Sequence, residues 1–577
     1  MVLLQCPGEK QWLQFTSPVE TVRALAPAEV LPALRRIEDA VRSRRLMAAG
    51  YIGYEASPGF DPALVVRRET PVPLVDFGLY ESAQWRDGPG HDRERAPSID
   101  WTPTVTPDDY AAALAEIKGH IGAGRTYQVN YSYRLRARFT GDPRLLFSRM
   151  TANSPDGFGA YLELDGITIC SASPELFFRL EGGVLTCRPM KGTAPRGRTL
   201  SEDRVHMQRL QDSEKDRAEN LMILDMVRND LGRVAEIGSV EVPRLFDVER
   251  YPTVLQMTST AKARTRASFT EIVAALFPCA SITGAPKAST MGIIAGLETT
   301  PRGIYTGCIG YLAPDGGSVR AQFNVAIRTV TIDHATGQAE YGVGGGILWD
   351  SDPAAERREC ETKTRVLVAP AGELCLLEAL LWTPRGWFLL ERHLERLAAS
   401  AEYFDFRFDP AALRKRLEDL SAELSPHPHK VRVELQRDGS LSVTAAPLAS
   451  TARPPVLRVG LARDPVDSED VYLYHKTSRR GAYETALAGR PGLDDVILWN
   501  ERGEVTESCT ANVVADIDGE RVTPPADCGL LAGTYRDHLL AEGRITERVI
   551  PVETLRGVRR LWLVNSVREW MDAALEE

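Results

Sequence analysis

The sequence predicts an α+β protein built from two different domains, and three observations support this prediction. The chain has 577 residues, more than one hydrophobic core usually holds. Amphipathic helical stretches alternate with short β-rich runs such as residues 157–164, a mixture typical of α+β domains. The Pro- and Gly-containing stretch at residues 366–372 indicates a boundary, and no internal repeat crosses it. We therefore expect one domain over residues 1–368 and a second over residues 369–577.

The composition limits the classes of function. Hydrophobic residues make up 43%, charged residues 26%, and the net charge is −10, which describes an ordinary globular protein and argues against a nucleic-acid partner. Nine cysteines lie without CxxC pairing, so a disulfide framework is not expected. Nine histidines show no metal-ligand spacing such as HExxH. Because neither a signal-peptide pattern nor an apolar run of membrane-spanning length is present, we expect a cytoplasmic protein without a membrane partner.

Lys191 stands within the run RPMKGTAPRG at residues 188–197. The proline before it stiffens the backbone, and the glycine after it leaves the backbone permissive. This arrangement suits an amine that acts as a nucleophile. An isolated Lys-Gly-Thr would instead indicate a surface β-turn, so the prediction depends on partner residues elsewhere in the chain.

Two predicted helices carry carboxylates that are candidates for binding a metal ion. The first spans about residues 212–227 and includes Glu219. The second starts with Asp352 as N-cap and a proline as first helical residue, and it places Glu356, Glu359 and Lys363 on one face. Carboxylates at this spacing often belong to a solvated helix face. Here, however, a glycine run at residues 341–346 offers backbone amides to an anion, and glutamates from two helices suit Mg²⁺, which takes few protein carboxylates.

These stretches together resemble the chorismate-utilising enzymes, whose large domain is an α/β sandwich. The resemblance implies Glu219 and Glu359 as metal ligands, Glu175 as general acid and Lys191 as nucleophile. A lysine at that position is typical of the aminodeoxychorismate synthases, whereas the anthranilate synthases usually carry alanine. The resemblance also implies a chorismate pocket lined by Gln128, Gly192, Thr193, Thr283, Lys287, Tyr305, Arg328, Gly344, Gly345 and Gly346.

Three further positions bear on the chemistry that the resemblance implies. Gln128 stands where the isochorismate synthases carry a lysine that activates water, and glutamine cannot act as that base. Ammonia is therefore the expected nucleophile. Asn220 stands where many anthranilate synthases have histidine, and Gln256 replaces a histidine of the family pattern. Neither residue takes part in the covalent chemistry that the resemblance implies.

We expect the ammonia to come from glutamine through a separate glutaminase subunit. Cys308 in a G-x-C-x-G run and His393 in a His-x-Glu run nearly match a class I glutaminase. Each of them, however, lies inside another pattern, so a glutaminase within the chain is the weaker interpretation.

The second half has a constellation of its own around Lys476, which ends an aromatic, strand-like run at residues 472–474. Taken alone, this lysine would be interpreted as a structural residue whose aliphatic side-chain carbons pack against apolar neighbours. Together with Arg396, Glu507 and the pair Gly533-Thr534, in this chain order, it resembles the fold-type IV pyridoxal-phosphate enzymes, a smaller α+β fold. The resemblance implies that Lys476 binds the cofactor covalently, that Glu507 keeps the pyridine nitrogen protonated, and that the phosphate is held by Arg396, Gly533, Thr534 and Ser566.

The combined resemblance implies a two-step synthesis of 4-aminobenzoate, the folate precursor, from chorismate. A Mg²⁺-dependent amination through a Lys191 adduct gives 4-amino-4-deoxychorismate, and a pyridoxal-phosphate-dependent lyase then releases pyruvate. By its own motifs the second half also fits a transaminase. The alternatives are an anthranilate synthase with an appended class IV aminotransferase, or a second half that is not catalytic.

Overall fold

The computed structural model describes residues 1–7, 11–67, 70, 72–88, 99–152, 157–251, 254–368, 374–448 and 456–576. The chain divides into two compact units, which are Met1–Arg196 with Met207–Gly372, and Gly197–His206 with Glu373–Glu577. The boundary that the sequence predicts near residue 370 falls at residues 369–373, outside the described part of the chain. Within the described ranges, no helix is both long and apolar enough to cross a membrane.

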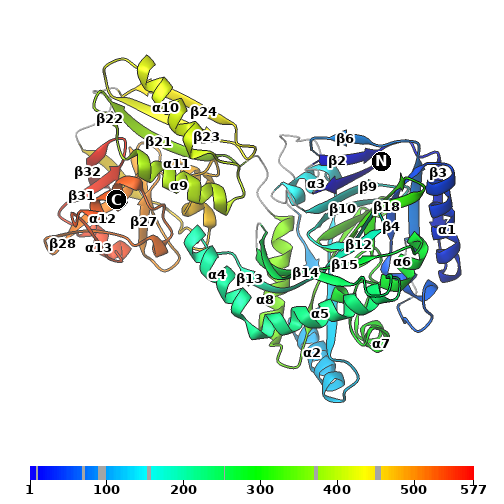
Figure 1. Ribbon diagram of the computed structural model, residues 1–577. Coiled ribbons are helices and arrows are strands. Elements are labelled where there is room, and N and C mark those ends of the chain that lie inside the picture. The colour runs from blue at the N-terminus through cyan, green and yellow to red at the C-terminus, as the bar shows by residue number, and fades with distance from the viewer. Residues whose placement is uncertain are drawn as a thin grey trace. The chain divides into compact units, whose positions relative to one another are not determined.

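The first unit contains two ten-stranded sheets (Figure 1). The strands of its first sheet are β1 (Val2–Cys6), β2 (Gln11–Phe15), β6 (Gln84–Arg86), β7 (Thr102–Pro103), β8 (Gln128–Arg138), β9 (Phe158–Glu163), β10 (Ile167–Ser173), β16 (Gly284–Ala285), β19 (Thr329–Asp333) and β20 (Gln338–Ile347). Their order is β16-β8-β20-β19-β10-β9-β1-β2-β6, with β7 beside β8.

The second sheet carries the strand of Lys191. Its strands are β3 (Glu20–Ala24), β4 (Met47–Ile52), β5 (Val75–Tyr80), β11 (Leu176–Glu181), β12 (Val184–Arg188), β13 (Met190–Pro195), β14 (Glu241–Arg250), β15 (Val254–Arg264), β17 (Cys308–Asp315) and β18 (Ser318–Val325). The order is β13-β15-β12-β11-β18-β17-β4-β5-β3, with β14 beside β15.

The two sheets pack face to face with helices on their outer faces. Buried residues of both sheets, among them Phe15, Tyr51 and Ile309, form the core between them. The outer face of the second sheet shares a core with α1 (Pro27–Ser43), α5 (Glu214–Gly232) and α6 (Phe269–Leu276). The outer face of the first sheet shares one with α2 (Pro107–Gly122), α3 (Pro143–Thr151), α7 (Lys287–Leu297) and α8 (Pro353–Thr364). This arrangement confirms the α/β sandwich expected for the large domain.

The helices that carry the candidate metal ligands begin at capping residues. The N-cap of α8 is Asp352, whose side chain accepts a hydrogen bond from the Ala355 amide at 2.9 Å, as its sequence predicts. The helix expected from residue 212 begins instead at Glu214 and runs to Gly232. Ser213 caps it by accepting from the Asp216 amide at 3.2 Å, and a separate helix, α4 (Leu200–Asp212), precedes it.

The second unit combines a small sheet with a larger sheet, part of which closes into a barrel. The small sheet has the strand order β22-β21-β23-β24 and packs against two helices. Its strands are β21 (Leu376–Thr383), β22 (Gly386–Trp387), β23 (His429–Leu435) and β24 (Leu441–Pro447), and the helices are α9 (Leu390–Tyr403) and α10 (Pro410–Glu423). The larger sheet comprises β25 (Leu457–Leu461), β26 (Asp495–Trp499), β27 (Val505–Ser508), β28 (Asn512–Ile517), β29 (Glu520–Thr523), β30 (Thr546–Glu547), β31 (Leu561–Asn565) and β32 (Glu569–Leu575). Because β27 pairs with both β26 and β28, the path β27-β26-β25-β32-β31-β28 closes on itself around an apolar core. The remaining helices are α11 (Gly481–Gly489), α12 (Thr534–Ala541) and α13 (Val552–Arg556).

The aromatic run before Lys476 is a turn of 3₁₀ helix, Val471–Leu473, so the expectation of a strand was wrong. The Asp470 side chain accepts a hydrogen bond from the Tyr472 amide at 3.0 Å, and the Tyr474 amide donates to the Val471 carbonyl at 3.1 Å. Local side-chain capping therefore overrides the β propensity of the aromatic residues.

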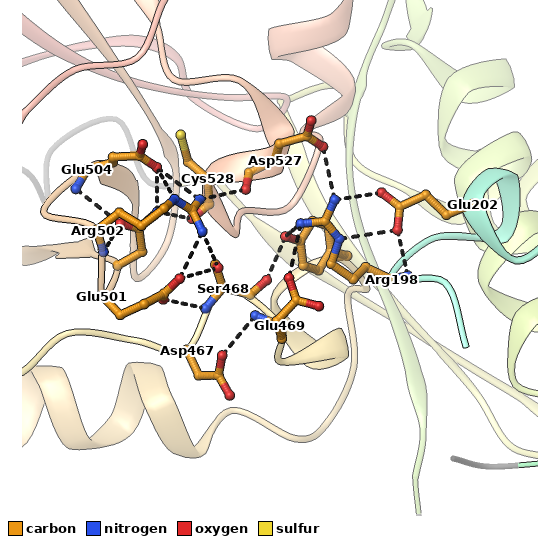
Figure 2. Close-up of polar contacts among 12 residues, drawn as sticks. Arg198, Glu202, Asp467, Ser468, Glu469, Glu501, Arg502, Glu504, Asp527 and Cys528 are labelled. Atoms are coloured by element: carbon orange, nitrogen blue, oxygen red, sulfur yellow. Dashed lines mark hydrogen bonds and ion pairs between the residues drawn. The ribbon is translucent and has the colours of Figure 1, made fainter. Parts of the chain in front are cut away.

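The segment Gly197–His206 of the second unit holds the residues that precede Lys476. Arg198 donates to the Tyr474 hydroxyl at 3.1 Å, and its carbonyl oxygen lies 3.1 Å from His475 Nε2. The Arg198 guanidinium also contacts Glu202 at 2.8 Å and Asp527 at 3.3 Å (Figure 2). Arg198 thus contacts both Tyr474 and His475, the two residues before Lys476.

Candidate active sites

A glycine and a register shift shape the strand that carries Lys191. Strand β13 pairs with β15, and the register shifts between Met190 and Thr193. Gly192 lies in this irregular stretch with φ of 97°, a conformation that favours glycine. A Cβ atom at Gly192 would also lie 3.1 Å from the Cβ of Asp216. The backbone conformation after Lys191 thus favours glycine, and the neighbouring helix leaves little room for a larger residue.

Asn220 and Gln256 hold the backbone of this lysine segment. Asn220 Nδ2 donates to the Lys191 carbonyl at 3.0 Å, and Gln256 Nε2 donates to the Gly192 carbonyl at 2.9 Å. Thr193 Oγ1 donates to Gln256 Oε1 at 3.1 Å. Asn220 and Gln256 therefore support the strand that carries Lys191, a role that the sequence alone did not indicate.

The Lys191 amine faces Glu219, Gln128 and Gly346. Its Nζ atom lies 3.1 Å from Glu219 Oε2. A Cβ atom at Gly346 would lie 2.6 Å from Lys191 Nζ and 2.7 Å from Gln128 Nε2. Gln128 is fully buried, and neither of its side-chain polar atoms has a hydrogen-bond partner among the described residues. Such a buried amide is costly unless a ligand satisfies it, so these residues fit a small polar substrate beside the amine.

The glycine run belongs to strand β20, and it makes space for neighbouring side chains. A Cβ atom at Gly342 would lie 2.2 Å from the Tyr305 ring, and one at Gly344 would lie 2.2 Å from the Tyr131 carbonyl. Gly345 faces Glu356, whose Oε2 would lie 3.2 Å from a Cβ atom there. The pairing of β20 with β19 ends at Tyr341, so the following residues pair with β8 along one edge and with no described strand along the other.

Glu175 is a buried carboxyl next to the Lys191 strand. It accepts a hydrogen bond from Ser281 Oγ at 2.7 Å and lies within reach of the Met190 amide. Burial raises the pKa of Glu175 to about 7, although hydrogen bonds from Ser281 and Met190 oppose this rise. A carboxyl with this pKa holds a proton near neutral pH, as a general acid requires.

The second candidate metal ligand, Glu359, also interacts electrostatically with the Lys191 amine. Lys191 and Lys363 both lower the pKa of Glu359, with Lys363 the larger influence at 2.8 Å. The pKa of Glu356 is raised by burial and by the nearby Glu359. Among the described residues no cluster of three or more His, Cys, Asp or Glu side chains surrounds a common point. Glu219 and Glu359, which both interact with the Lys191 amine, nevertheless fit Mg²⁺, because this ion takes only one or two carboxylates beside water and substrate oxygens.

The remaining residues predicted for the chorismate pocket lie in different surroundings. Arg328 stacks over Tyr251 with its guanidinium 5.9 Å from the ring centroid, and burial lowers its pKa. Within the described part of the chain no ion pair joins Arg328 to a carboxylate, which suits it to an acidic ligand. Lys287 instead pairs with Asp230 at 3.0 Å, and Thr283 Oγ1 donates to the Cys279 carbonyl at 3.3 Å. The geometry thus gathers Gln128, Lys191 and Gly346 closely, while Lys287 and Thr283 are engaged within the protein.

Cys308 and His393, the near match to a glutaminase, serve other roles. Cys308 is buried in the core beneath the second sheet. His393 is buried in the second unit and pairs with Glu378. Both side chains therefore have structural partners of their own.

Lys476 and Glu507 form the centre of the second site. Burial, with a further contribution from Arg396, lowers the pKa of Lys476 to about 8. Glu507 accepts hydrogen bonds from the Tyr483 hydroxyl at 2.8 Å and the Leu531 amide at 3.0 Å. Burial raises the pKa of Glu507 to about 7, and both Lys476 and Glu507 act electrostatically on each other. Tyr483 was not predicted, because nothing in its local sequence marks it as a partner of Glu507.

Three of the four predicted phosphate-binding residues lie at or next to the start of one helix. Gly533 is the N-cap of α12 and Thr534 its first residue, as expected. A Cβ atom at Gly533 would lie 2.0 Å from Asn512 Oδ1. Arg396 Nη1 donates to the Ala532 carbonyl at 3.2 Å, and Ser566 Oγ donates to the Ala379 carbonyl at 3.4 Å. A nucleophilic amine, a buried carboxyl, an arginine and a helix N-terminus fit the aldehyde, ring nitrogen and phosphate of pyridoxal phosphate.

Glu378 of β21 is a second residue of this site that was not predicted. Its side chain is buried and contacts both Arg396 and His393 at 2.7 Å. A signal was present, because Glu378 is the one acidic residue in the otherwise apolar run at residues 374–382. A lone carboxylate in a buried strand is rare unless it is paired.

Comparisons with known proteins give a family match for each half of the chain. Residues 1–369 match the model of the chorismate binding enzymes, and residues 376–575 match that of amino-transferase class IV. Aminodeoxychorismate synthase component 1 of Salmonella typhimurium is 37% identical over 350 residues, which is 56% of this chain and 76% of that protein. An anthranilate synthase component 1 of Haloarcula marismortui is 41% identical over 270 residues, covering 46% of this chain and 54% of the relative, about half its length.

A solved structure shares the fold of the first half. Anthranilate synthase component I from Streptococcus pneumoniae superposes with a TM-score of 0.53 at 23% identity, covering 62% of this chain and 91% of that one. At this identity the likeness concerns the fold. The chain belongs to the family of chorismate binding enzymes through residues 1–369, and it carries a region of the amino-transferase class IV type at residues 376–575.

Proposed function

We propose that the chain makes 4-aminobenzoate from chorismate in two steps, one in each unit. The observation that carries the proposal is the Lys191 amine, which lies 3.1 Å from Glu219 and shares the space beside Gly346 with the unsatisfied amide of Gln128. The similarity to an aminodeoxychorismate synthase supports the same product. Identity by itself does not separate this activity from anthranilate synthesis, since an anthranilate synthase relative is equally similar. We assign the 4-amino product because Lys191 stands where the anthranilate synthases usually carry alanine.

The residues of the first site divide the amination between them. Glu175, whose pKa is raised to about 7 by burial, donates a proton to the C4 hydroxyl of chorismate, which leaves as water. The Lys191 amine forms a bond to C2 through its nitrogen lone pair as the C4–O bond breaks and the ring double bond shifts. Ammonia then forms a bond to C4, the double bond returns, and the C2–N bond to Lys191 breaks. Mg²⁺ held by Glu219 and Glu359 would bind the substrate carboxylate and offset its charge.

The residues of the second site suit proton transfer at an amine-bearing carbon. Pyridoxal phosphate, when bound, would supply an electron sink for that carbon. Lys476, with a pKa lowered to about 8, can take the proton from the carbon near neutral pH. Glu507 would hold a proton at the ring nitrogen, and Tyr483 fixes its carboxyl at 2.8 Å. The loss of this proton and of pyruvate makes the ring aromatic.

The class IV region is also compatible with a transaminase, and we favour the lyase because the first site would supply its substrate. We infer that ammonia comes from a separate glutaminase subunit. The relative from Salmonella typhimurium is named component 1 of its synthase, which supports this inference. Ammonium salts replace that subunit in a test on the purified chain.

A product assay with two lysine variants tests both steps. With chorismate, ammonium, Mg²⁺ and pyridoxal phosphate, chromatography of the wild-type reaction should give 4-aminobenzoate. Lys191→Ala should abolish amination at C4, whereas Lys215→Ala, which removes an exposed lysine near the same Glu219, should not. Lys476→Ala should let 4-amino-4-deoxychorismate accumulate. Anthranilate as the main wild-type product would refute the first step, and undiminished 4-aminobenzoate from Lys476→Ala would refute the second.

A further inference from the structure

A buried carboxylate, Glu378, connects the residues around the candidate phosphate end of the second site. Its side chain is 2% exposed. Arg396 Nε donates to Glu378 Oε1 at 2.8 Å, and Arg396 Nη2 donates to Oε2 at 2.7 Å. His393 Nδ1 lies 2.7 Å from the same Oε2 atom. One carboxylate thereby fixes an arginine and a histidine that are three positions apart on α9.

The two-pronged contact determines which way the guanidinium points. Both carboxylate oxygens engage one edge of Arg396, the geometry that makes such pairs directional. A third N–H of Arg396 donates to the Ala532 carbonyl at 3.2 Å. Since a guanidinium has five N–H groups, two are left for a ligand next to the start of α12.

His393 extends the same arrangement to Thr534. A carboxylate only accepts hydrogen bonds, so His393 Nδ1 must carry a hydrogen toward Glu378. The other ring nitrogen, Nε2, lies 3.2 Å from Thr534 Oγ1. Thr534 begins α12, where the amides of the first turn lack partners within the helix. Glu378 thus orients Arg396 directly and Thr534 through His393.

The charges around Glu378 keep it ionised. Burial alone would raise its pKa, but Arg396 and His393 outweigh burial and hold the pKa far below its usual range. Arg396 lowers the pKa of Lys476, and Glu378 opposes that effect. Lys476 therefore lies within electrostatic reach of the Glu378–Arg396 pair, which places the pair in the cofactor site.

We propose that Glu378 is a positioning residue for the phosphate of pyridoxal phosphate, because it aims Arg396 and, through His393, Thr534 at that group. This inference rests on the proposed use of pyridoxal phosphate by the second unit. A buried ion pair with a purely structural role would affect every ligand of the site equally. A phosphate-positioning role affects only the ligand that carries the phosphate.

The test compares pyridoxal phosphate with pyridoxal, which lacks the phosphate. The full-length chain is titrated with each compound, and the dissociation constants are read from the absorbance of the bound ring. Glu378→Gln should weaken binding of pyridoxal phosphate about 10-fold or more, the effect of losing one charge-assisted hydrogen bond. Its affinity for pyridoxal should stay close to the wild-type value. Glu391→Gln is the matched control, since Glu391 lies on α9, the helix of Arg396, and forms a surface ion pair with Arg414 of α10, with 69% of the Glu391 side chain exposed.

The result is decided by one ratio, the affinity for pyridoxal phosphate divided by the affinity for pyridoxal. The inference is overturned if Glu378→Gln leaves that ratio unchanged, whether both affinities fall together or neither does. If Glu378→Gln does not fold, His393→Gln keeps the Glu378–Arg396 pair and should still lower the ratio. A wild-type chain that binds neither compound would instead refute the use of pyridoxal phosphate itself.

Discussion

A methyl group at Gly346 tests whether the space beside Lys191 is catalytic. In Gly346→Ala the new Cβ atom would lie 2.6 Å from Lys191 Nζ and 2.7 Å from Gln128 Nε2. Ordinary contacts between heavy atoms are about 3.5 Å or longer, so the amine must retreat by roughly 1 Å. A misplacement of about 1 Å at a reacting group costs about 100-fold in rate, equal to about 2.7 kcal/mol of barrier. We therefore expect the ammonium-dependent formation of 4-amino-4-deoxychorismate to fall about 100-fold.

The assay must separate this effect from unfolding. Gly346 is not among the residues with positive φ, and the atoms that the methyl group meets end flexible side chains, so the melting temperature should change little. Gly296→Ala in α7 makes the same chemical change where nothing lies within 4 Å, and it should retain full activity. The rate is followed by chromatography, with the second step measured separately on supplied 4-amino-4-deoxychorismate. A Gly346→Ala enzyme with a normal melting temperature and a wild-type amination rate would refute the placement of the chemistry beside Lys191.

Two further predictions follow from Glu175 and Arg198. Because burial raises the pKa of Glu175 to about 7, its carboxyl is protonated below that pH and ionised above it. The amination rate, measured at a constant concentration of unprotonated ammonia, should therefore decline as the pH rises through about 7. The Glu175→Gln variant should lack this decline. A wild-type rate that stays unchanged up to a pH of about 9 would contradict the assignment of Glu175 as the general acid. Arg198→Ala should destabilise the second unit by about 1 kcal/mol through its lost bond to Tyr474, as urea unfolding would measure. Arg414→Ala, which removes an exposed ion pair, should cost less than about 0.5 kcal/mol, and equal losses in the two variants would count against a role for Arg198.

The parts of the fold that were predicted correctly depend on local chemistry. The start of α8 follows from Asp352 and Pro353, because an N-cap and a first-turn proline act within a few residues. The strand at Phe158–Glu163 follows from its β-rich composition. The run at residues 472–474 was misassigned because Asp470 caps a 3₁₀ turn there, and a capping contact of this kind competes with intrinsic propensity.

The residues that support the candidate sites could not be predicted in the same way. Asn220 contacts the Lys191 carbonyl across 29 positions of sequence, and Thr534 contacts His393 across 141. Contacts between residues so far apart in the chain leave no periodic or local pattern in the sequence. Glu378 was detectable as an acidic residue in an apolar run, but its partners were not.

The sequence by itself determined the class of fold, the candidate nucleophiles Lys191 and Lys476, and most of the residues expected around them, since these reside in short contiguous motifs. Only the tertiary structure decided which of them meet. It brought Gln128, Gly346 and Glu219 to the Lys191 amine and paired Lys287 with Asp230 instead. The physical reason is that hydrogen bonds and ion pairs act over about 3 Å in space, and distances in space between distant residues are set by the packing of sheets and helices.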